Sequence, residues 1–332
     1  ILPWNAPFWL AFRFAAPALM AGNTCVMKHD AHVPACAAGI AESFEKAGFP
    51  LGVFQNMPLD KDDIAGAIET ECVRAVSFTG SDRAGAIVAA TAARQIKPAV
   101  LELGGSDPVI VLADADLEAA ADTVVLSRII NAGQSCIAAK RIIIEEAVYE
   151  RFLDMMKTRL EKLTMGDPRQ ESTDVGPIAR PDLRDGLHRQ VQASIEAGAR
   201  CLMGGKMPDG DGFFYPPTLL ADVDDSMVAF CEETFGPIAV AMSARDADHA
   251  LEIANSSQYG LGAAVWTGDT ARAMNMARDI EAGQVSINGI VKTDPRLPSG
   301  GVKRSGYGRE LGPHGIKMFV NAQQVWVGPK QG

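Results

Sequence analysis

The sequence lacks the patterns that mark disulfide-rich, zinc-binding and membrane-spanning proteins. Its six cysteines form neither a CxxC pair nor a zinc-ribbon spacing, which indicates reduced thiols in a cytoplasmic protein. We expect no metal site, because His29, His32 and Cys36 are better explained as helix-entry residues before Pro34 than as a ligand set. No stretch reaches the roughly 18 continuous apolar residues that a membrane span needs, so no membrane partner is expected.

Three further absences restrict the function and the reading of the N-terminus. The net charge of −10, without basic runs, argues against nucleic acid as a partner. The glycine fingerprint GxGxxG, the usual sign of dinucleotide binding, does not occur. The chain begins at Ile1 instead of Met, within a strand-like segment. We therefore expect an N-terminal portion to be missing, and with it any targeting signal.

The composition that is present indicates an α/β protein with two Rossmann-like domains. Hydrophobic residues make up 47% of the 332 residues, enough for a large core. Strand-like and helix-like segments alternate over residues 1–104 and again over 105–305, and we assign these ranges to a nucleotide-binding and a catalytic domain. Residues 306–332 would carry a strand at about 319–328 that nothing later in the chain covers. That strand suits pairing with another subunit, so we expect a homodimer or homotetramer.

One cysteine lies at the end of a loop that is built mainly from small residues. Asn131-Ala132-Gly133-Gln134-Ser135-Cys136 follows an apolar helical run and precedes the strand-like residues 141–144. The small side chains around Cys136 leave room for a substrate to approach its sulfur. The competing interpretation is that Cys136 is a buried small hydrophobe, as most free cysteines are.

Polar residues also lie at the carboxyl ends of three predicted strands, where parallel sheets bind ligands. They are Lys28, the turn Thr79-Gly80-Ser81 and Glu102. A strand followed by Gly80-Ser81 and a helix start suits a phosphate, because free N–H groups and the helix dipole both favour an anion. A plain strand-to-helix turn explains the same residues.

Taken in order, the motifs resemble those of the aldehyde dehydrogenase superfamily over essentially the whole chain. The resemblance is carried by Pro3-Trp4-Asn5-Ala6-Pro7, Lys28, Phe78-Thr79-Gly80-Ser81, Glu102-Leu103-Gly104-Gly105, Gly133-Gln134-Ser135-Cys136, Glu232-Glu233-Thr234-Phe235-Gly236-Pro237 and Gly300-Gly301-Val302-Lys303. It is greatest to succinate-semialdehyde dehydrogenases. The resemblance implies a further N-terminal segment, which we expect to be missing from this sequence.

The resemblance implies oxidation of an aldehyde to a carboxylic acid through a cysteine thioester. Cys136 would be the nucleophile, Asn5 would stabilise the oxyanion, and Glu102 would activate water. Taken singly, Asn5 also suits a turn between two prolines, and Glu102 suits a strand-end carboxylate paired with a lysine. A protein that keeps the fold without turnover is the alternative of another class.

The resemblance also implies NAD or NADP as the cofactor. Its implied ligands are Lys28, Gly80, Ser81, Gly104, Glu233 and Phe235. Ala31 stands where many relatives have a ribose-binding glutamate, which permits a 2′-phosphate, and Lys28 and His29 would favour one electrostatically. Aspartates in the loop of residues 57–63 act in the opposite direction, so both cofactors remain open.

Arg13 is the residue that restricts the class of aldehyde substrate. It lies among aromatic residues of a helix expected to start near Pro7, where a charge is costly unless it meets an anion. Relatives that act on succinic semialdehyde hold the far carboxylate with an arginine here, and we expect Arg13 and polar groups of residues 292–296 to do the same. The alternatives are an arginine paired with a structural Asp or Glu, and an uncharged aliphatic or aromatic substrate.

Overall fold

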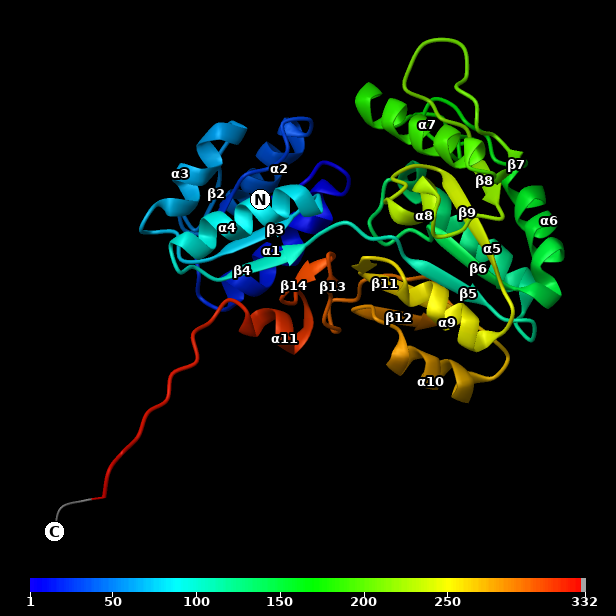
Figure 1. Cartoon of the computed structure of the whole chain (residues 1–332). Coiled ribbons are helices and arrows are strands. Elements are labelled where there is room, and N and C mark those ends of the chain that lie inside the picture. The colour runs from blue at the N-terminus through cyan, green and yellow to red at the C-terminus, as the bar shows by residue number, and fades with distance from the viewer. Residues whose placement is uncertain (330–332) are drawn as a thin grey trace.

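A computed structural model of the chain describes residues 1–329 and places them in two α/β lobes joined by the stretch after β4 (Figure 1). The first lobe contains α1 (Pro7–Met20), β1 (Cys25–Met27), α2 (Pro34–Lys46), β2 (Phe54–Asn56), α3 (Ile64–Glu69), β3 (Val76–Thr79), α4 (Asp82–Arg94) and β4 (Ala99–Glu102). The predicted α/β class with parallel strands is confirmed. The exact limits predicted for the domains stay a prediction.

The first lobe has two short sheets instead of the single layer that the sequence suggests. Strand β1 pairs in parallel with β2, and β3 pairs in parallel with β4. The backbone of residues 1–2 bridges them, because the Leu2 N–H donates to Lys28 and the Thr79 N–H donates to Ile1. Strand β14 (Gly306–Tyr307) adds an antiparallel edge to β4, so the C-terminal part of the chain returns to the first lobe.

The second lobe is built on a seven-stranded sheet with the order β12-β11-β5-β6-β9-β8-β7, in which only the edge strand β7 is antiparallel to its neighbour. Its strands are β5 (Pro108–Val111), β6 (Arg141–Glu145), β7 (Arg200–Met203), β8 (Thr218–Ala221), β9 (Ile238–Ala244), β11 (Gly262–Trp266) and β12 (Gln284–Ile287). Its helices are α5 (Leu117–Ile129), α6 (Tyr149–Leu160), α7 (Pro181–Glu196), α8 (Val228–Cys231), α9 (Ala247–Asn255) and α10 (Thr270–Asp279).

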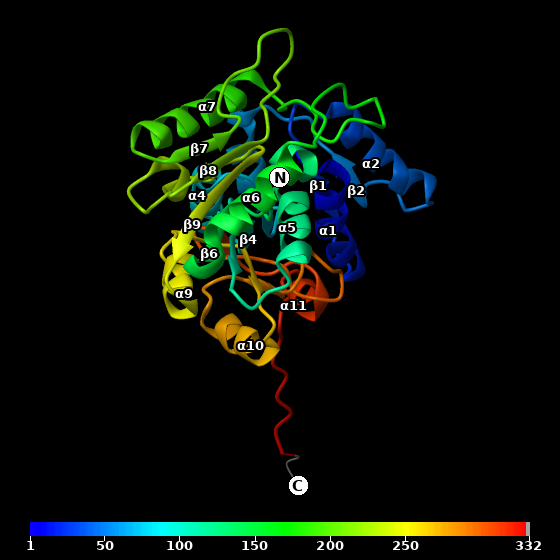
Figure 2. The same cartoon turned by 90° about the vertical axis from the view of Figure 1, so that its right-hand side faces the viewer.

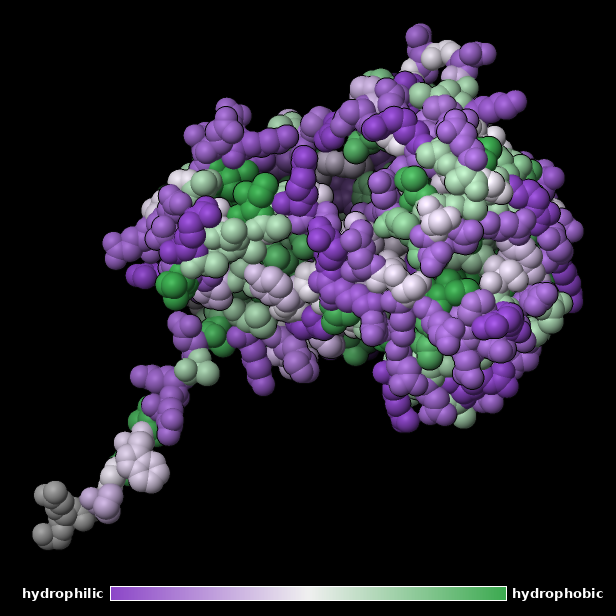
Figure 3. Space-filling model, in the orientation of Figure 1, coloured by the Kyte–Doolittle hydropathy of each residue, from purple (hydrophilic) through white to green (hydrophobic). Residues whose placement is uncertain are grey.

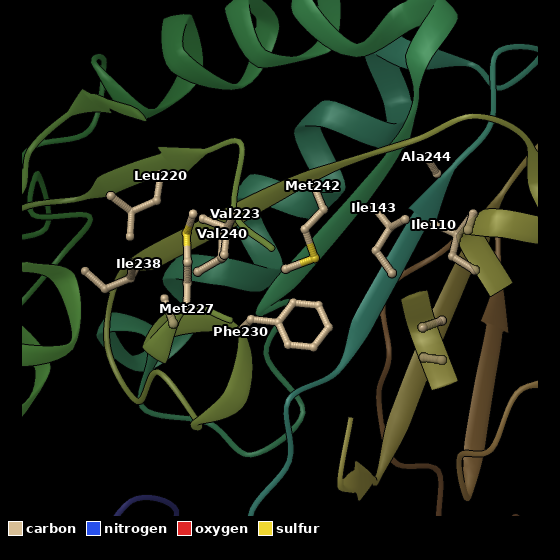
Figure 4. Packing of buried hydrophobic residues seen from close by; sticks show 14 of the residues in the cluster. Ile110, Ile143, Leu220, Val223, Met227, Phe230, Ile238, Val240, Met242 and Ala244 are labelled. Carbon is tan, nitrogen blue, oxygen red and sulfur yellow. The ribbon is translucent and has the colours of Figure 1, made fainter. Parts of the chain in front are cut away.

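Both faces of this sheet are apolar and covered by helices, which is why its strands read as continuous hydrophobic runs. In β6, Ile142 and Ile144 face the side covered by α5 and α6, whereas Ile143 faces the side of α7 to α10. Figure 4 shows the second of these clusters, where Met227 and Phe230 lie beside Val240 and Met242. Burial on both faces makes the sheet a rigid support for the loops at its ends.

Local sequence signals set several helix starts. Side-chain oxygens of Ser81, Asp116, Asp246 and Asp269 accept hydrogen bonds from the first turns of α4, α5, α9 and α10, respectively. Each such cap satisfies an N–H that the helix itself leaves free. Proline occupies the first turn of α1, α2 and α7, where its missing N–H costs nothing.

Two segments of the C-terminal third differ from the expected structure in this single chain. The segment 299–308, whose many glycines are typical of a loop, contains β14 and β13 (Val302–Lys303), and β13 pairs with β10 (Tyr259–Gly260). The strand predicted at 319–328 does not form: α11 (Gly312–Lys317) ends just before it, and residues 321–329 have no regular structure and leave the body of the molecule (Figures 1 and 2). A strand needs a hydrogen-bonding neighbour, and none of the described residues supplies one.

Among residues 1–329, every helix falls short of the length and apolar character that crossing a bilayer requires.

Candidate active site

The residues that the sequence singled out gather between the two lobes, where the chain leaves β4. Glu102 ends β4, Cys136 lies in the loop before β6, and Asn5 precedes α1. Figure 3 shows the surface hollowed between the lobes on the side of α7. The lobes therefore contribute different chemical groups to one site.

The loop before Cys136 has an unusual backbone. Asn131, Ala132 and Gly133 all have positive φ, at 54°, 51° and 75°. Each such non-glycine residue costs about 1–3 kcal/mol, so neighbouring contacts must hold the loop in place. The buried Arg128 does so by donating to the carbonyl oxygens of Gly133, at 2.6 Å, and Ala139, at 3.1 Å.

Asn5 is tied to this loop by two hydrogen bonds. Its Nδ2 donates to the carbonyl of Gln134 at 3.1 Å, and Asn131 Nδ2 donates to the carbonyl of Asn5 at 2.9 Å. A primary amide has two N–H donors, and this arrangement uses one. The second N–H has no acceptor in this arrangement of the described residues.

Both cations and carboxylates act on the pKa of the Cys136 thiol. Burial raises the pKa of Cys136 to about 11, against the lowering effects of Lys140 and Arg13, while Glu102 and Glu233 raise it further. A sulfur in this environment is a thiol at neutral pH and needs a base before it can act as a nucleophile.

Glu102 is the carboxyl group suited to accept a proton. Burial and the nearby Glu310 raise its pKa to about 7, against the lowering effects of Arg13 and Arg309. The side chain is 3% exposed, and its Oε1 lacks a hydrogen-bond partner among residues 1–329. A carboxyl group that titrates near neutrality and has a free oxygen can serve as a general base.

Arg13 is already paired with two carboxylates in this structure. Its guanidinium forms ion pairs with Glu310 and, at 3.5 Å, with Glu102, and its side chain is 4% exposed. These two carboxylates raise the pKa of Arg13 despite burial. The isolated chain thus shows the pairing alternative considered from the sequence, and binding of a substrate carboxylate by Arg13 remains a proposal.

The predicted cofactor residues Gly104 and Glu233 meet on the other side of the cysteine loop. Oε1 of Glu233 accepts from the N–H of Gly105 at 3.1 Å and pairs with Lys140 at 3.2 Å. Oε2 lies so close to the backbone that a Cβ on Gly104 would sit 2.6 Å from it. Gly104 therefore leaves the backbone without a side chain beside the Glu233 carboxylate. A carboxylate oxygen there can accept hydrogen bonds from the hydroxyls of a nucleotide ribose.

Phe235 and Trp4 pack edge to face, with their ring centroids 6.0 Å apart. Phe235 is half-buried two residues beyond Glu233, beside the same loop. An aromatic face at this position suits the flat ring of a nicotinamide, whereas Trp4 acts as a packing residue.

The phosphate site predicted at Gly80-Ser81 lies at the start of α4. Ser81 caps this helix by accepting from the N–H of Ala84 at 3.3 Å, and the N–H of Gly80 donates to the carbonyl of Glu102. Asp82 in the first turn would repel a phosphate, but Arg304 pairs with it at 2.6 Å and offsets its charge. The helix start therefore keeps its preference for an anion.

Lys28 and His29 follow β1, and only Lys28 supplies positive charge. Lys28 is half-buried, whereas His29 is buried, with its Nε2 3.2 Å from the carbonyl oxygen of Pro7. Burial lowers the pKa of His29, and its Nδ1 accepts from the N–H of Asp30 at 2.9 Å, so both favour the neutral ring. The expected electrostatic contribution of His29 to 2′-phosphate binding therefore gains no support from the structure.

Three further residues belong to the site, and two of them, Glu310 and Lys140, were not identified from the sequence. Glu310 holds Arg13 and accepts a hydrogen bond from Ser77 at 3.1 Å. Lys140 contacts both the cysteine loop and Glu233. The buried hydroxyl of Ser299 has no partner among the described residues, and its backbone exchanges hydrogen bonds with that of Glu310. The only local sequence signal for these missed residues was that Lys140 lies four residues after Cys136.

Comparison with known proteins gives concordant results. The sequence profile described as "Aldehyde dehydrogenase family" matches residues 1–325. The chain is 48% identical over 328 residues to succinate-semialdehyde dehydrogenase [NADP(+)] of Mycobacterium avium, covering 99% of this chain and 70% of the relative. It superposes with a TM-score of 0.96 and 33% identity on succinic semialdehyde dehydrogenase of Streptococcus pyogenes in complex with NADP+, over 98% of this chain and 72% of that one. For an NAD+ complex of Mycobacterium tuberculosis aldehyde dehydrogenase the TM-score is 0.92, with 37% identity over 96% of this chain and 66% of that one.

Proposed function

Because the chain belongs to the aldehyde dehydrogenase family, we propose that it oxidises succinic semialdehyde to succinate, with Cys136 as the nucleophile. NAD(P)-dependent oxidation of an aldehyde is the reaction of this family, and the chain is such an oxidoreductase. The convergence of Asn5, Glu102 and Cys136 from separate parts of the chain carries the assignment of roles.

In the first step, the sulfur of Cys136 attacks the aldehyde carbon while its proton passes to a base. Glu102 is suited to this role, because its pKa of about 7 leaves much of it ionised at neutral pH. The carbonyl oxygen becomes negative as the carbon–sulfur bond forms. The free N–H of the Asn5 amide and the backbone N–H of Cys136 donate to it.

In the second step, the thioester on Cys136 is hydrolysed. When bound, NAD(P) would supply the acceptor for the hydride that the thiohemiacetal on Cys136 loses in becoming this thioester. Glu102 then removes a proton from the water that attacks the thioester carbon, which releases the acid and frees Cys136. Its burial and its unpartnered Oε1 leave one oxygen available for that water.

We propose NADP as the preferred cofactor. Lys28 would pair with the 2′-phosphate, and Ala31 places no carboxylate three residues further on to repel it. The start of α4 would hold the pyrophosphate, and Oε2 of Glu233 would accept from the nicotinamide ribose. The names of the Mycobacterium avium and Streptococcus pyogenes relatives, which specify NADP, support this preference.

The carboxylate of succinic semialdehyde would bind between Arg13 and Ser299. Arg13 keeps a small exposed fraction although two glutamates hold it, and the Ser299 hydroxyl is buried without a partner. A substrate carboxylate would accept from both groups and satisfy that hydroxyl.

Replacing Arg13 with leucine tests the substrate, provided that two aldehydes are compared. Arg13 lowers the pKa of Glu102, so R13L raises that pKa and slows both substrates at neutral pH. Loss of the carboxylate contact adds a further loss for succinic semialdehyde only, of about tenfold to a hundredfold in kcat/KM, as expected for a charged hydrogen bond. The measurement is the ratio of kcat/KM for succinic semialdehyde to that for butyraldehyde, before and after substitution.

An unchanged ratio would reject the carboxylate role of Arg13 while leaving aldehyde oxidation intact. Cys136→Ala tests the chemistry separately, because it should abolish turnover of both aldehydes and keep NADP binding.

We further propose a homodimer or homotetramer in the cytoplasm. Val325, Trp326 and Val327 are exposed in the single chain, which suits a strand that pairs with a second copy. The six cysteines are free thiols, as a reducing compartment favours.

A further inference from the structure

Lys140 is a buried cation next to the candidate nucleophile. Its Nζ lies 2.7 Å from the carbonyl oxygen of Cys136, 2.9 Å from that of Ser135 and 3.2 Å from Oε1 of Glu233. A lysine ammonium has three N–H donors, and these three acceptors account for all of them. The side chain is 1% exposed, so water cannot replace a lost partner.

The three acceptors belong to two separate parts of the site. Two are backbone carbonyls of the cysteine loop, and the third is the carboxylate proposed to bind the cofactor ribose. Burying an ammonium costs several kcal/mol unless it is fully paired, and a hydrophobic side chain would serve stability equally well. The burial of Lys140 is therefore better explained by a role in the site than by a contribution to stability.

We propose that Lys140 is a positioning residue that couples the nucleophile loop to the cofactor-binding carboxylate. Through one ammonium group it fixes the backbone of Cys136 and the orientation of Glu233. The inference rests on the roles proposed above for Cys136 and Glu233.

The contacts around Glu233 show how the coupling works. Lys140 and the Gly105 N–H both hold Oε1, which turns Oε2 towards the bare backbone of Gly104. A Cβ on Gly105 would lie 2.8 Å from the carbonyl oxygen of Cys136, so the cysteine loop and the Glu233 contact are packed against the same backbone. Movement of the ammonium would shift both.

The charge of Lys140 also acts on the Cys136 thiol. Besides burial, the groups that act on this thiol are Lys140 and Arg13, which favour the thiolate, and Glu102 and Glu233, which oppose it. Lys140 in turn faces Asp107 as well as Glu233. Removing Lys140 should therefore disfavour the thiolate, whereas neutralising Glu233 should favour it.

The test is alkylation of Cys136 by iodoacetamide between pH 7 and pH 9.5, resolved by site with mass spectrometry, in Lys140→Met and Glu233→Gln. Below its pKa, a thiol reacts in proportion to its thiolate fraction, so one pKa unit changes the rate tenfold. We expect Cys136 to react about tenfold more slowly in K140M and several-fold faster in E233Q. A general loosening of the site would accelerate both variants and cannot produce opposite signs.

Lys157→Met is the matched control, because Lys157 pairs with Glu161 on the surface, at 3.8 Å, and should leave Cys136 unchanged. The exposed Cys72 provides an internal reference in every sample. The second readout is NADP affinity by calorimetry, expected to weaken about tenfold or more in K140M and to be unchanged in K157M.

Equal rates in all variants, or shifts of the same sign in K140M and E233Q, would overturn the inference. If K140M does not fold, Lys140→Gln takes its place, because it also removes the charge: slower alkylation of Cys136 supports the coupling and an unchanged rate rejects it. Failure of the proposed function is distinct, because C136A would then retain aldehyde oxidation whatever Lys140 does.

Discussion

At the scale of single residues, one guanidinium lies between two buried carboxylates. Arg13 pairs with both Glu102 and Glu310, so a cation that a substrate carboxylate would also use lowers the pKa of the proposed general base, against the larger effect of burial. The isolated chain therefore links substrate recognition to base strength. This link makes the acidic limb of the pH profile sensitive to residues that touch neither substrate nor cofactor.

Replacing Glu310 with glutamine should shift that limb to lower pH. Glu310 raises the pKa of Glu102 by charge repulsion, so its neutralisation lowers that pKa from about 7 and keeps the base ionised in more acidic solution. A fall of about one unit would increase the ionised fraction of Glu102 at pH 6 roughly fivefold. The measurement is kcat/KM for butyraldehyde, which lacks a carboxylate, from pH 5 to pH 9.

Glu161→Gln removes an exposed carboxylate that pairs with Lys157, and its profile should match that of the unmodified protein. A limb that moves to higher pH in E310Q would contradict the arrangement of charges described here.

At the scale of elements, the cysteine loop shows how a strained backbone is held in place. Arg128 on α5 donates to carbonyls on both sides of the loop, while Asn5 from the other lobe ties down its middle. Burial lowers the pKa of Arg128 to about 9, yet the group remains charged at neutral pH. The loop thus depends on contacts from two elements that are distant in the sequence.

Gly133→Ala tests this element. Gly133 has a φ of 75°, and a Cβ there would lie 2.3 Å from the carbonyl oxygen of Gly236. Left-handed strain and overpacking together should destabilise the protein by about 2–5 kcal/mol, seen as a lower midpoint of urea unfolding. Gly48→Ala is the matched control: its φ is 81°, but nothing lies within 4 Å of the added Cβ, so only about 1 kcal/mol is expected. Equal losses would mean that the contact with Gly236 is relieved at little cost.

At the scale of the whole molecule, the tail of residues 321–329 leaves the body of the chain (Figure 2). Its apolar residues Val325, Trp326 and Val327 are 75%, 82% and 86% exposed. Exposed β-formers in sequence suit an edge strand that another subunit completes. The proposed oligomer is therefore a property of the tail and not of the two lobes.

Ending the chain at residue 320 tests this proposal. We expect the full chain to elute as a dimer or larger species in size-exclusion chromatography with light scattering, and the shortened chain to shift to the monomer. Val325→Pro removes one N–H and should weaken the assembly without shortening the chain. A shortened chain that keeps the mass of the full assembly would place the interface elsewhere.

Much of this arrangement was predictable from the sequence because its signals are local. The helix over residues 34–46 and the strand over 141–145 follow from hydrophobic periodicity and burial, and the ordered motifs around Asn5, Glu102 and Cys136 identify the family. Such signals do not specify partners. The strand predicted at 319–328 is not formed in the single chain and stays a prediction for the assembly, because its periodicity says nothing about which neighbour would complete it.

Only the tertiary structure decided the charge states and contacts of the site. Folding brings Arg13 next to Glu310, from the opposite end of the chain, and Lys140 next to Glu233. Because these cations are buried, the carboxylates and not water are their partners. Burial also lowers the pKa of His29 and so disfavours its cation, although its place beside Lys28 suggested a second positive charge. The sequence by itself determined the family and the candidate chemical groups, since both are written in residue types and their order. Which carboxylate each cation neutralises depends on distance and solvent exclusion, which only the folded chain defines.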